Sequence, residues 1–134
     1  MKINNETDYA FRIMRLLAQR GQMTDAKTVS EITSLPQRFT LKILGKLVSG
    51  GLVSSKKGSN GGYMLKRDAD KITLLDILEV IEGPVEISRC LGDDFVCRHD
   101  GVNEKCNCFF NKVLNDINLT IATKLKSVTV KDSL

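Results

Sequence analysis

Hydrophobic positions recur at helical spacing through the first part of the chain and predict three short helices, over residues 8–20, 28–34 and 36–49. Glycines follow the first and third segments, where they can end a helix. In the second segment the spacing turns Val29 and Ile32 inward. In the third, the predicted apolar stripe consists of Phe39, Ile43, Leu44, Leu47 and Val48.

After the third helix the pattern changes to that of a β-hairpin. Residues 52–55 and 63–65 are predicted as short strands, joined by a loop that contains three glycines and two lysines. A fourth helix begins at Thr73, with Asp76 as its capping-box partner, and ends at Gly83. The expected fold class is mainly α with a small β-hairpin wing, in the element order of a winged helix-turn-helix.

The last part of the chain divides into a polar segment and a long helix. Residues 84–108 are irregular and carry all four cysteines, and a helix is predicted from 109 to about 126. Its apolar positions have the spacing of a heptad seam: Phe110, Leu114, Ile117, Ile121 and Leu125. This helix either packs on its own domain or, as we expect, forms a two-fold dimer with a second copy.

We therefore expect a DNA-binding domain over residues 1–83, a cysteine-rich sensor loop over 84–108, and a dimerisation helix with a C-terminal tail over 109–134. The 134 residues are 42% hydrophobic and 27% charged, which is typical of a globular protein. The chain has no signal-peptide core and no run of about 20 apolar residues. These features predict a soluble cytoplasmic protein with no membrane partner.

Charge is distributed unevenly along the chain. Residues 32–67 contain seven basic and no acidic residues, whereas the rest of the chain contains 13 basic and 16 acidic ones. A polyanion partner explains this asymmetry, and a solvated lysine-rich surface is the alternative. An enzyme is not expected, because the single histidine lies in a loop and there is neither a nucleophile–base pair nor a phosphate-binding motif.

Double-stranded DNA is the polyanion that the element order favours. The third helix fits the major groove, where Arg38 can pair with a guanine edge, while Lys42 and Lys46 project into solvent toward phosphates. The lysines of the hairpin can reach a phosphate ridge or a narrow minor groove. The candidate DNA-binding residues are Gln37, Arg38, Thr40, Lys42, Lys46, Lys56, Lys57, Ser59 and Asn60. A winged-helix protein–protein adaptor is the alternative.

Several motifs resemble those of the IscR/NsrR-type winged-helix transcription regulators. They are TDYAFR at 7–12, PQRF at 36–39, GLV at 51–53, GSNGGY at 58–63, and the segment from 72 to 83. The resemblance implies a homodimeric repressor that binds a partly palindromic operator, with the last helix crossing to the other subunit. It also implies that Arg38 and its neighbours read the major groove and that Lys57 enters the minor groove.

Thiolates clustered in a loop suit an iron–sulfur cluster or Zn²⁺. Cluster-binding members of the resembled family place three cysteines here, and Cys90 and Cys97 match the first two. The separations to Cys97 and on to Cys106, six and eight residues, are wider than usual. Cys106 is favoured as the third ligand, with Cys108 as the alternative. The resemblance implies that such a cluster, 4Fe-4S or 2Fe-2S, senses nitric oxide, redox state or iron–sulfur status.

Other interpretations of the same residues stay open. Asp8 matches a carboxylate that completes the cluster in nitric-oxide-sensing relatives, but it could instead cap the first helix. Cys108 or His99 could supply the fourth ligand. The cysteines could also hold zinc, form a disulfide such as Cys97–Cys106, or act as simple thiols. The last case corresponds to a cluster-free, thiol- or partner-responsive regulator of the cysteine-metabolism type.

Overall fold

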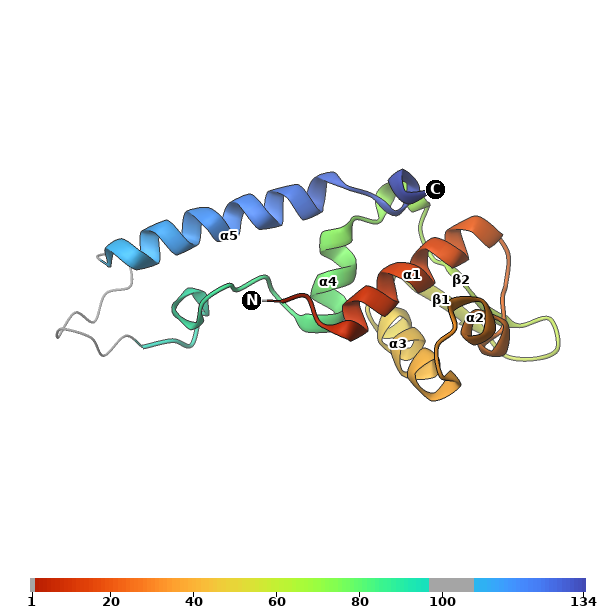
Figure 1. Cartoon of the computed structure of the whole chain (residues 1–134). Helices are drawn as coiled ribbons and strands as arrows, with labels where there is room; N and C mark the ends of the chain where they lie inside the picture. Colours follow the sequence, from red (N-terminus) through yellow and green to blue (C-terminus); the bar gives the residue numbers. More distant parts are fainter. Residues whose placement is uncertain (1, 97–107) are drawn as a thin grey trace.

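A computed structural model describes residues 2–96 and 108–134 of the chain (Figure 1). Helices dominate, and the two strands pair antiparallel from Val53 opposite Leu65 to Lys56 opposite Gly62. The described elements are α1 (Asn5–Arg20), α2 (Ala26–Thr33), α3 (Gln37–Ser49), β1 (Val53–Lys56), β2 (Gly62–Leu65), η1 (Ala69–Lys71), α4 (Leu74–Glu82), η2 (Arg89–Leu91), α5 (Phe109–Ser127) and η4 (Val130–Ser133). The predicted fold class, mainly helical with a hairpin, is confirmed.

Side-chain caps fix where the helices begin. The backbone N–H of Thr7 donates to the Asn4 side chain at 2.8 Å, so α1 starts three residues before the predicted position. Asp25 caps α2 in the same way. The capping box predicted for α4 is present, with reciprocal hydrogen bonds of 2.9 and 3.1 Å between Thr73 and Asp76. Each cap satisfies backbone donors that the first helical turn leaves free.

One hydrophobic core unites α1, α3, α4 and the hairpin. Its fully buried large side chains include Ile13, Met14, Leu17, Ile43, Leu44, Leu47, Leu52 and Ile77. The prediction for Ile32 was wrong, because this side chain is 53% exposed while Val29 is fully buried. Ser34 adopts a left-handed conformation, φ 57°, and this turn brings Leu35 rather than Ile32 into the core.

The C-terminal tail returns to the DNA-binding domain, which the hydrophobic pattern did not indicate. Val130 is 2% exposed, and its N–H donates to the Ile72 carbonyl at 2.9 Å. The N–H of Leu74 donates to the Val128 carbonyl at the same distance. Arg15 of α1 donates its Nε–H to the Ser133 carbonyl at 3.0 Å. The C-terminal end of α5 is therefore anchored, while its other end extends beyond the domain (Figure 1).

The long helix α5 has no fully buried residue. Its exposed apolar side chains are Phe109, Phe110, Val113, Ile117 and Leu119, between 41% and 71% exposed. Among the described ranges, no helix is both long and apolar enough to cross a bilayer.

Candidate DNA-binding surface and cysteine segment

The first turn of α3 presents an open surface. Gln37 and Arg38 are exposed, and the Arg38 guanidinium lies 5.2 Å from the centre of the Phe39 ring. Such a cation–π contact orients an arginine without using up its hydrogen-bond donors. Arg38 therefore keeps the forked donor edge that can recognise a guanine.

The position of the buried stripe on α3 corrects two predictions. Thr40 is fully buried and its hydroxyl donates to the Pro36 carbonyl at 3.2 Å, so Thr40 has no surface to offer to a base. Phe39, assigned to the apolar stripe, is 39% exposed instead. The core face of α3 follows residues 40, 43, 44 and 47, and a threonine occupies its first position because its hydroxyl is satisfied by the preceding turn.

Two exposed apolar residues on α3 were absent from the candidate list. Phe39 and Leu41 flank the buried Thr40, and Leu41 is 45% exposed. In a major groove, apolar side chains at such positions can contact thymine methyl groups. For Leu41 the signal was available in the sequence, because it falls outside the helical spacing that joins Ile43, Leu44 and Leu47, whereas Phe39 lies four residues before Ile43.

Lys42 and Lys46 form ion pairs with α1, whereas the sequence predicted that both side chains project into solvent. The Nζ of each lies 2.5 Å from a different carboxylate oxygen of Glu6. The Lys42 ammonium, with Lys46 beside it, lowers the pKa of the Glu6 carboxyl. Although residues 32–67 contain no acidic residue, the fold thus supplies one from 36 positions earlier in the chain.

The base of the wing is anchored to the loop between α1 and α2. Thr24 and Tyr63 exchange two backbone hydrogen bonds of 2.9 Å each. Gly62 adjoins this bridge with φ +139°, and a Cβ there would lie 2.6 Å from the Thr24 carbonyl. A Cβ on Gly61 would lie 2.1 Å from the Lys56 carbonyl oxygen. These close approaches require glycine and fix where the wing points.

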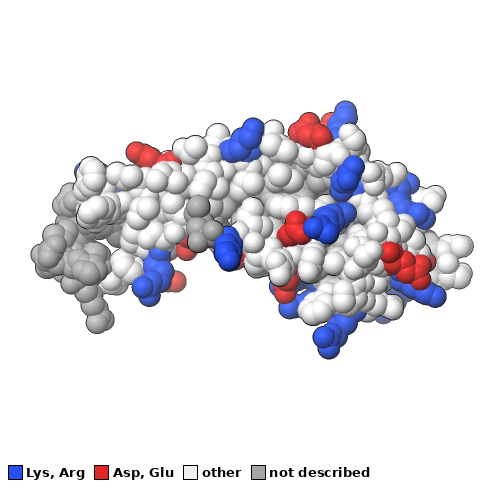
Figure 2. Space-filling model, viewed as in Figure 1, with Lys and Arg blue, Asp and Glu red and all other residues white. Residues whose placement is uncertain are grey.

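The tip of the wing is open to solvent. Its exposed candidate residues are Lys56, Lys57, Ser59 and Asn60. Ser59 and Asn60 also line a polar hollow that they share with Arg20 and Thr28. On the face shown in Figure 2, Lys and Arg side chains gather mainly over the end of the molecule that holds α1–α3 and the hairpin. A basic surface that includes a helix and a hairpin fits a duplex better than a small molecule.

Two asparagines of α5 hold the segment that follows α4. The side chain of Asn118 accepts from the Ile87 N–H at 3.0 Å and donates to the Val85 carbonyl at 2.7 Å. Two helical turns earlier, Asn111 donates to the Cys90 carbonyl at 3.1 Å. The segment from 85 to 90 is therefore aligned along α5, and Cys90 is held next to the start of that helix.

The structure places part of the predicted ligand set. Cys90 lies in η2 with its Sγ 3.2 Å from the Ser88 hydroxyl, and Cys108 is the residue before α5. Both cysteines are partly buried. Cys97, Cys106 and His99 lie outside the described residues. Within the described ranges, no three His, Cys, Asp or Glu side chains gather closely enough to hold a metal ion.

Asp8 lies in the first part of α1 and is exposed. Its carboxylate is 3.0 Å from the guanidinium of Arg12, one turn further along the helix. Asn4 is the capping residue of α1, so the interpretation of Asp8 as the cap was wrong. Its exposed position leaves a carboxylate oxygen accessible to another subunit, which keeps the prediction of a ligand role open.

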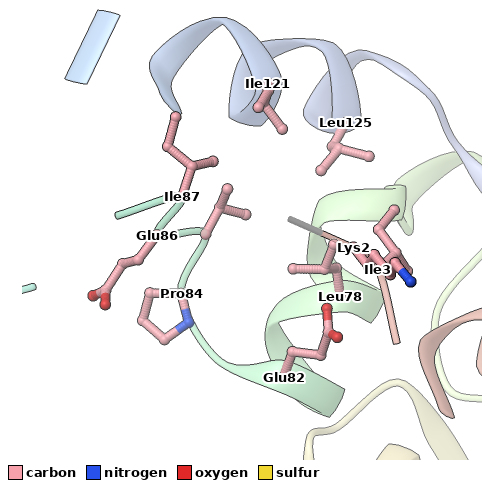
Figure 3. A pocket seen from close by; sticks show the side chains of 10 residues that line it. Lys2, Ile3, Leu78, Glu82, Pro84, Glu86, Ile87, Ile121 and Leu125 are labelled. Carbon is pink, nitrogen blue, oxygen red and sulfur yellow. The ribbon is translucent and has the colours of Figure 1, made fainter. Parts of the chain in front are cut away.

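A cavity of about 490 Å³ separates α4 from α5 (Figure 3). Ile121 and Leu125 project from α5 over Leu78 of α4, with Pro84 and Ile87 at the side. Glu82 lies on its rim and accepts a hydrogen bond of 2.8 Å from the backbone N–H of Asn4. The cavity thus adjoins both the cysteine segment and the residues that begin α1.

Known transcriptional regulators are similar to this chain along almost its whole length. The sequence profile of the Rrf2 family, described as an iron-dependent transcriptional regulator, matches residues 3–134. The HTH-type transcriptional regulator CymR of Bacillus subtilis is 34% identical over 96 residues, which cover 70% of this chain and 70% of CymR.

Solved structures share the fold. The structure of CymR, the global cysteine regulator of B. subtilis, has a TM-score of 0.78 at 27% identity and covers 98% of this chain and 95% of that one. IscR of T. potens has a TM-score of 0.73 at 24% identity, covering 99% of this chain and 85% of that one, which shows a common fold. The winged-helix architecture predicted from the sequence is confirmed.

Proposed function

This chain belongs to the Rrf2 family and is a DNA-binding transcriptional regulator, and we propose that it acts as a homodimeric repressor of a partly palindromic operator. The observation that supports this proposal best is the open first turn of α3 beside an anchored basic wing. Gln37 and Arg38 contact base edges in the major groove, and Lys57 enters the adjacent minor groove. Lys56, Ser59 and Asn60 contact the DNA backbone. The phosphate contacts of Lys42 and Lys46 depend on Glu6, which forms an ion pair with each of them.

The second copy of the chain covers α5. In one protomer Ile121 and Leu125 of the predicted seam are half-buried beside α4, whereas Phe110 and Ile117 are 71% and 43% exposed. A contiguous apolar face of this kind marks an interaction surface, and two-fold self-association is the commonest way to bury it. A two-fold dimer also presents two α3 helices to successive major grooves, as a partly palindromic operator requires.

The cysteine segment carries the proposed sensor. The described thiols fit an iron–sulfur cluster in chemistry, because Cys90, in η2, and Cys108, directly before α5, are soft ligands. Asn111 holds Cys90 at the start of α5, which also supports Cys108 as the alternative to Cys106. Cys97, Cys106 and Asp8 of the partner subunit complete the proposed ligand set, with Cys108 as the alternative to Cys106. When bound, the cluster would supply iron that reacts with nitric oxide and oxidants.

Residues of the chain itself connect this segment to DNA binding. Asn111 and Asn118 tie the segment to α5, and α5 sets the separation of the two α3 helices in the proposed dimer. A group bound at Cys90 would therefore be connected, through Asn111, to the helix that sets the spacing of the two α3 helices. A free-energy difference of about 1–3 kcal/mol between the states with and without that group would change DNA affinity about 5- to 150-fold.

The DNA-binding proposal is tested with the intact protein and a genomic promoter fragment over a range of salt concentrations. Affinity should fall steeply with salt, by about 0.9 in the logarithmic slope for each phosphate contact. The variant Arg38→Ala/Lys57→Ala should lose sequence-specific binding. Lys124→Ala/Lys126→Ala removes the same number of charges from α5 and should not. Weak, salt-insensitive binding by the wild type would instead indicate a protein–protein adaptor.

The sensor proposal is tested by anaerobic purification, followed by the visible absorption spectrum and the iron and sulfide content. A brown protein with matched iron and sulfide that nitric oxide bleaches would support the cluster. Single Cys106→Ser and Cys108→Ser variants show which thiol is the third ligand. A colourless, iron-free protein from iron-replete anaerobic cells would overturn the cluster and leave the cluster-free thiol regulator, with DNA binding unaffected.

A further inference from the structure

The contact between Glu6 and α3 joins two elements that are distant in sequence. Lys42 and Lys46 lie one helical turn apart, and each ammonium lies 2.5 Å from its own oxygen of the same carboxylate. A phosphate group bridging two lysines would use the same arrangement, with one oxygen for each ammonium. The two positive charges that the sequence assigns to this helix face are thus partly neutralised within the chain.

The surroundings of Glu6 hold it in this position. The preceding cap fixes the first turn of α1, since the Thr7 N–H and hydroxyl both donate to the Asn4 side chain. Asn4 is itself tied to α4 through the 2.8 Å hydrogen bond to Glu82. Thr7, the next residue along, is fully buried, so the turn cannot rotate freely. Glu6 retains 27% side-chain exposure, whereas Lys42 retains 53% and remains accessible to solvent.

We propose that Glu6 limits the affinity of this regulator for duplex DNA of any sequence, because its carboxylate withholds Lys42 and Lys46 from phosphate contacts. This inference rests on the proposed DNA-binding function. Its carboxylate occupies the two ammonium groups as an internal substitute for phosphate. Fewer lysine ammonium groups are then available to contact the phosphates of any duplex, while the side chains of Gln37 and Arg38 are not affected. The electrostatic part of the affinity for any duplex is lower as a result.

The physical reason lies in the origin of non-specific affinity. Binding that does not read the sequence comes from phosphate contacts and the counterions they release. Two fewer contacts lower the logarithmic salt slope by about 1.8, and over a fourfold range of salt each contact changes affinity about threefold. Binding to an operator loses the same electrostatic contribution and keeps its contacts with bases, so Glu6 lowers both affinities by a similar factor.

The test compares the intact protein and its variants on a random-sequence 30-base-pair duplex at several salt concentrations. Glu6→Gln removes the charge but keeps the side-chain size, and it should steepen the salt slope by about one to two. At low salt it should tighten non-specific binding by about three- to tenfold. Glu31→Gln is the matched control, because Glu31 is an exposed residue of α2, which packs against α3. It changes the net charge equally and should leave the slope unchanged.

A second variant tests whether the two lysines cause the steeper salt slope and the tighter non-specific binding. Lys42→Gln/Lys46→Gln should have little effect in the wild type but should abolish the gain in the Glu6→Gln background. A Glu6→Gln protein that matches Glu31→Gln in slope would overturn the inference while the DNA-binding function stands. If neither the wild type nor Glu6→Gln showed salt-dependent binding to this duplex or a promoter fragment, the proposed function itself would fail. Circular dichroism melting of each variant verifies that it is folded.

Discussion

The DNA-binding domain and the helix α5 use hydrophobic residues in opposite ways. In the domain, Ile13, Leu44 and Ile77 are at most 1% exposed and pack in one core. In α5, Phe110 and Ile117 are 71% and 43% exposed, and no residue of the helix is fully buried. One region buries its apolar side chains within a protomer, and the other leaves several exposed, which the proposed dimer would cover. The contrast separates the stability of the fold from the proposed assembly.

The two regions are nevertheless connected in two ways, through the tail that follows α5 and through the segment that follows α4. The tail after the helix packs into the domain through Val130, and Asn111 and Asn118 hold the cysteine segment along the helix. A structural change at Val130 or at either asparagine can therefore be transmitted to α3 through packed or hydrogen-bonded groups. This arrangement links the proposed sensor segment to the DNA-binding domain without requiring that the segment contact DNA.

Leu44→Ala should produce the largest effect that distinguishes the two regions. Leu44 is fully buried, so its truncation leaves a cavity and should lower the free energy of unfolding by about 3–5 kcal/mol. Leu119→Ala on α5, at a side chain that is 57% exposed and off the predicted seam, should change it by less than about 0.5 kcal/mol. Urea unfolding at one protein concentration measures both. Equal losses of unfolding free energy in the two variants would contradict the difference drawn between the domain and α5.

Ile117→Glu should act on assembly and not on the fold. By symmetry the dimer would bury two carboxylates on the seam, which should raise the dimer dissociation constant on the order of 100-fold, or about 2.7 kcal/mol. Sedimentation velocity measures the change, with Leu119→Glu on the opposite face as the control. A dimer that survives Ile117→Glu but dissociates with Leu119→Glu would assign the interface to the other face of α5.

The smallest effect concerns the acid sensitivity that Glu6 gives to the domain. Its pKa is lowered in the folded state from the ordinary value of 4.5, first by Lys42 and then by Lys46. Between the lowered and the ordinary pKa, Glu6 binds a proton more readily in the unfolded chain than in the folded one. The stability that Glu6 contributes is therefore full above the ordinary pKa and is lost as the pH falls through the lowered pKa. The contribution is below about 1 kcal/mol, because the lysines are partly exposed.

Unfolding free energies of the wild type and Glu6→Gln between about pH 6 and pH 3 measure this contribution. The difference between the two proteins should shrink as the pH falls. A constant difference over that range would mean that the ion pairs contribute nothing to stability, and it would also weaken the case for a persistent contact with α3.

Local signals in the sequence were sufficient for most of the fold. The helical spacing of the buried residues in α1 and α3, the capping box at Thr73, and the glycine-rich turn of the wing each act over a few residues. Thr40 and Phe39 were misplaced because an apolar residue was preferred over a threonine for the core, although the spacing favoured Thr40. The ligand roles of Cys97 and Cys106 stay predictions.

The sequence by itself determined the order of elements, the exposed first turn of α3 at Gln37 and Arg38, and the presence of a long helix with apolar positions, because periodicity and capping are properties of neighbouring residues. Only the tertiary structure decided which charges meet. Glu6 reaches Lys42 and Lys46 across 36 and 40 positions, and the tail reaches Ile72 after the whole of α5. Such contacts depend on how the helices pack, and packing is a property of the folded chain as a whole.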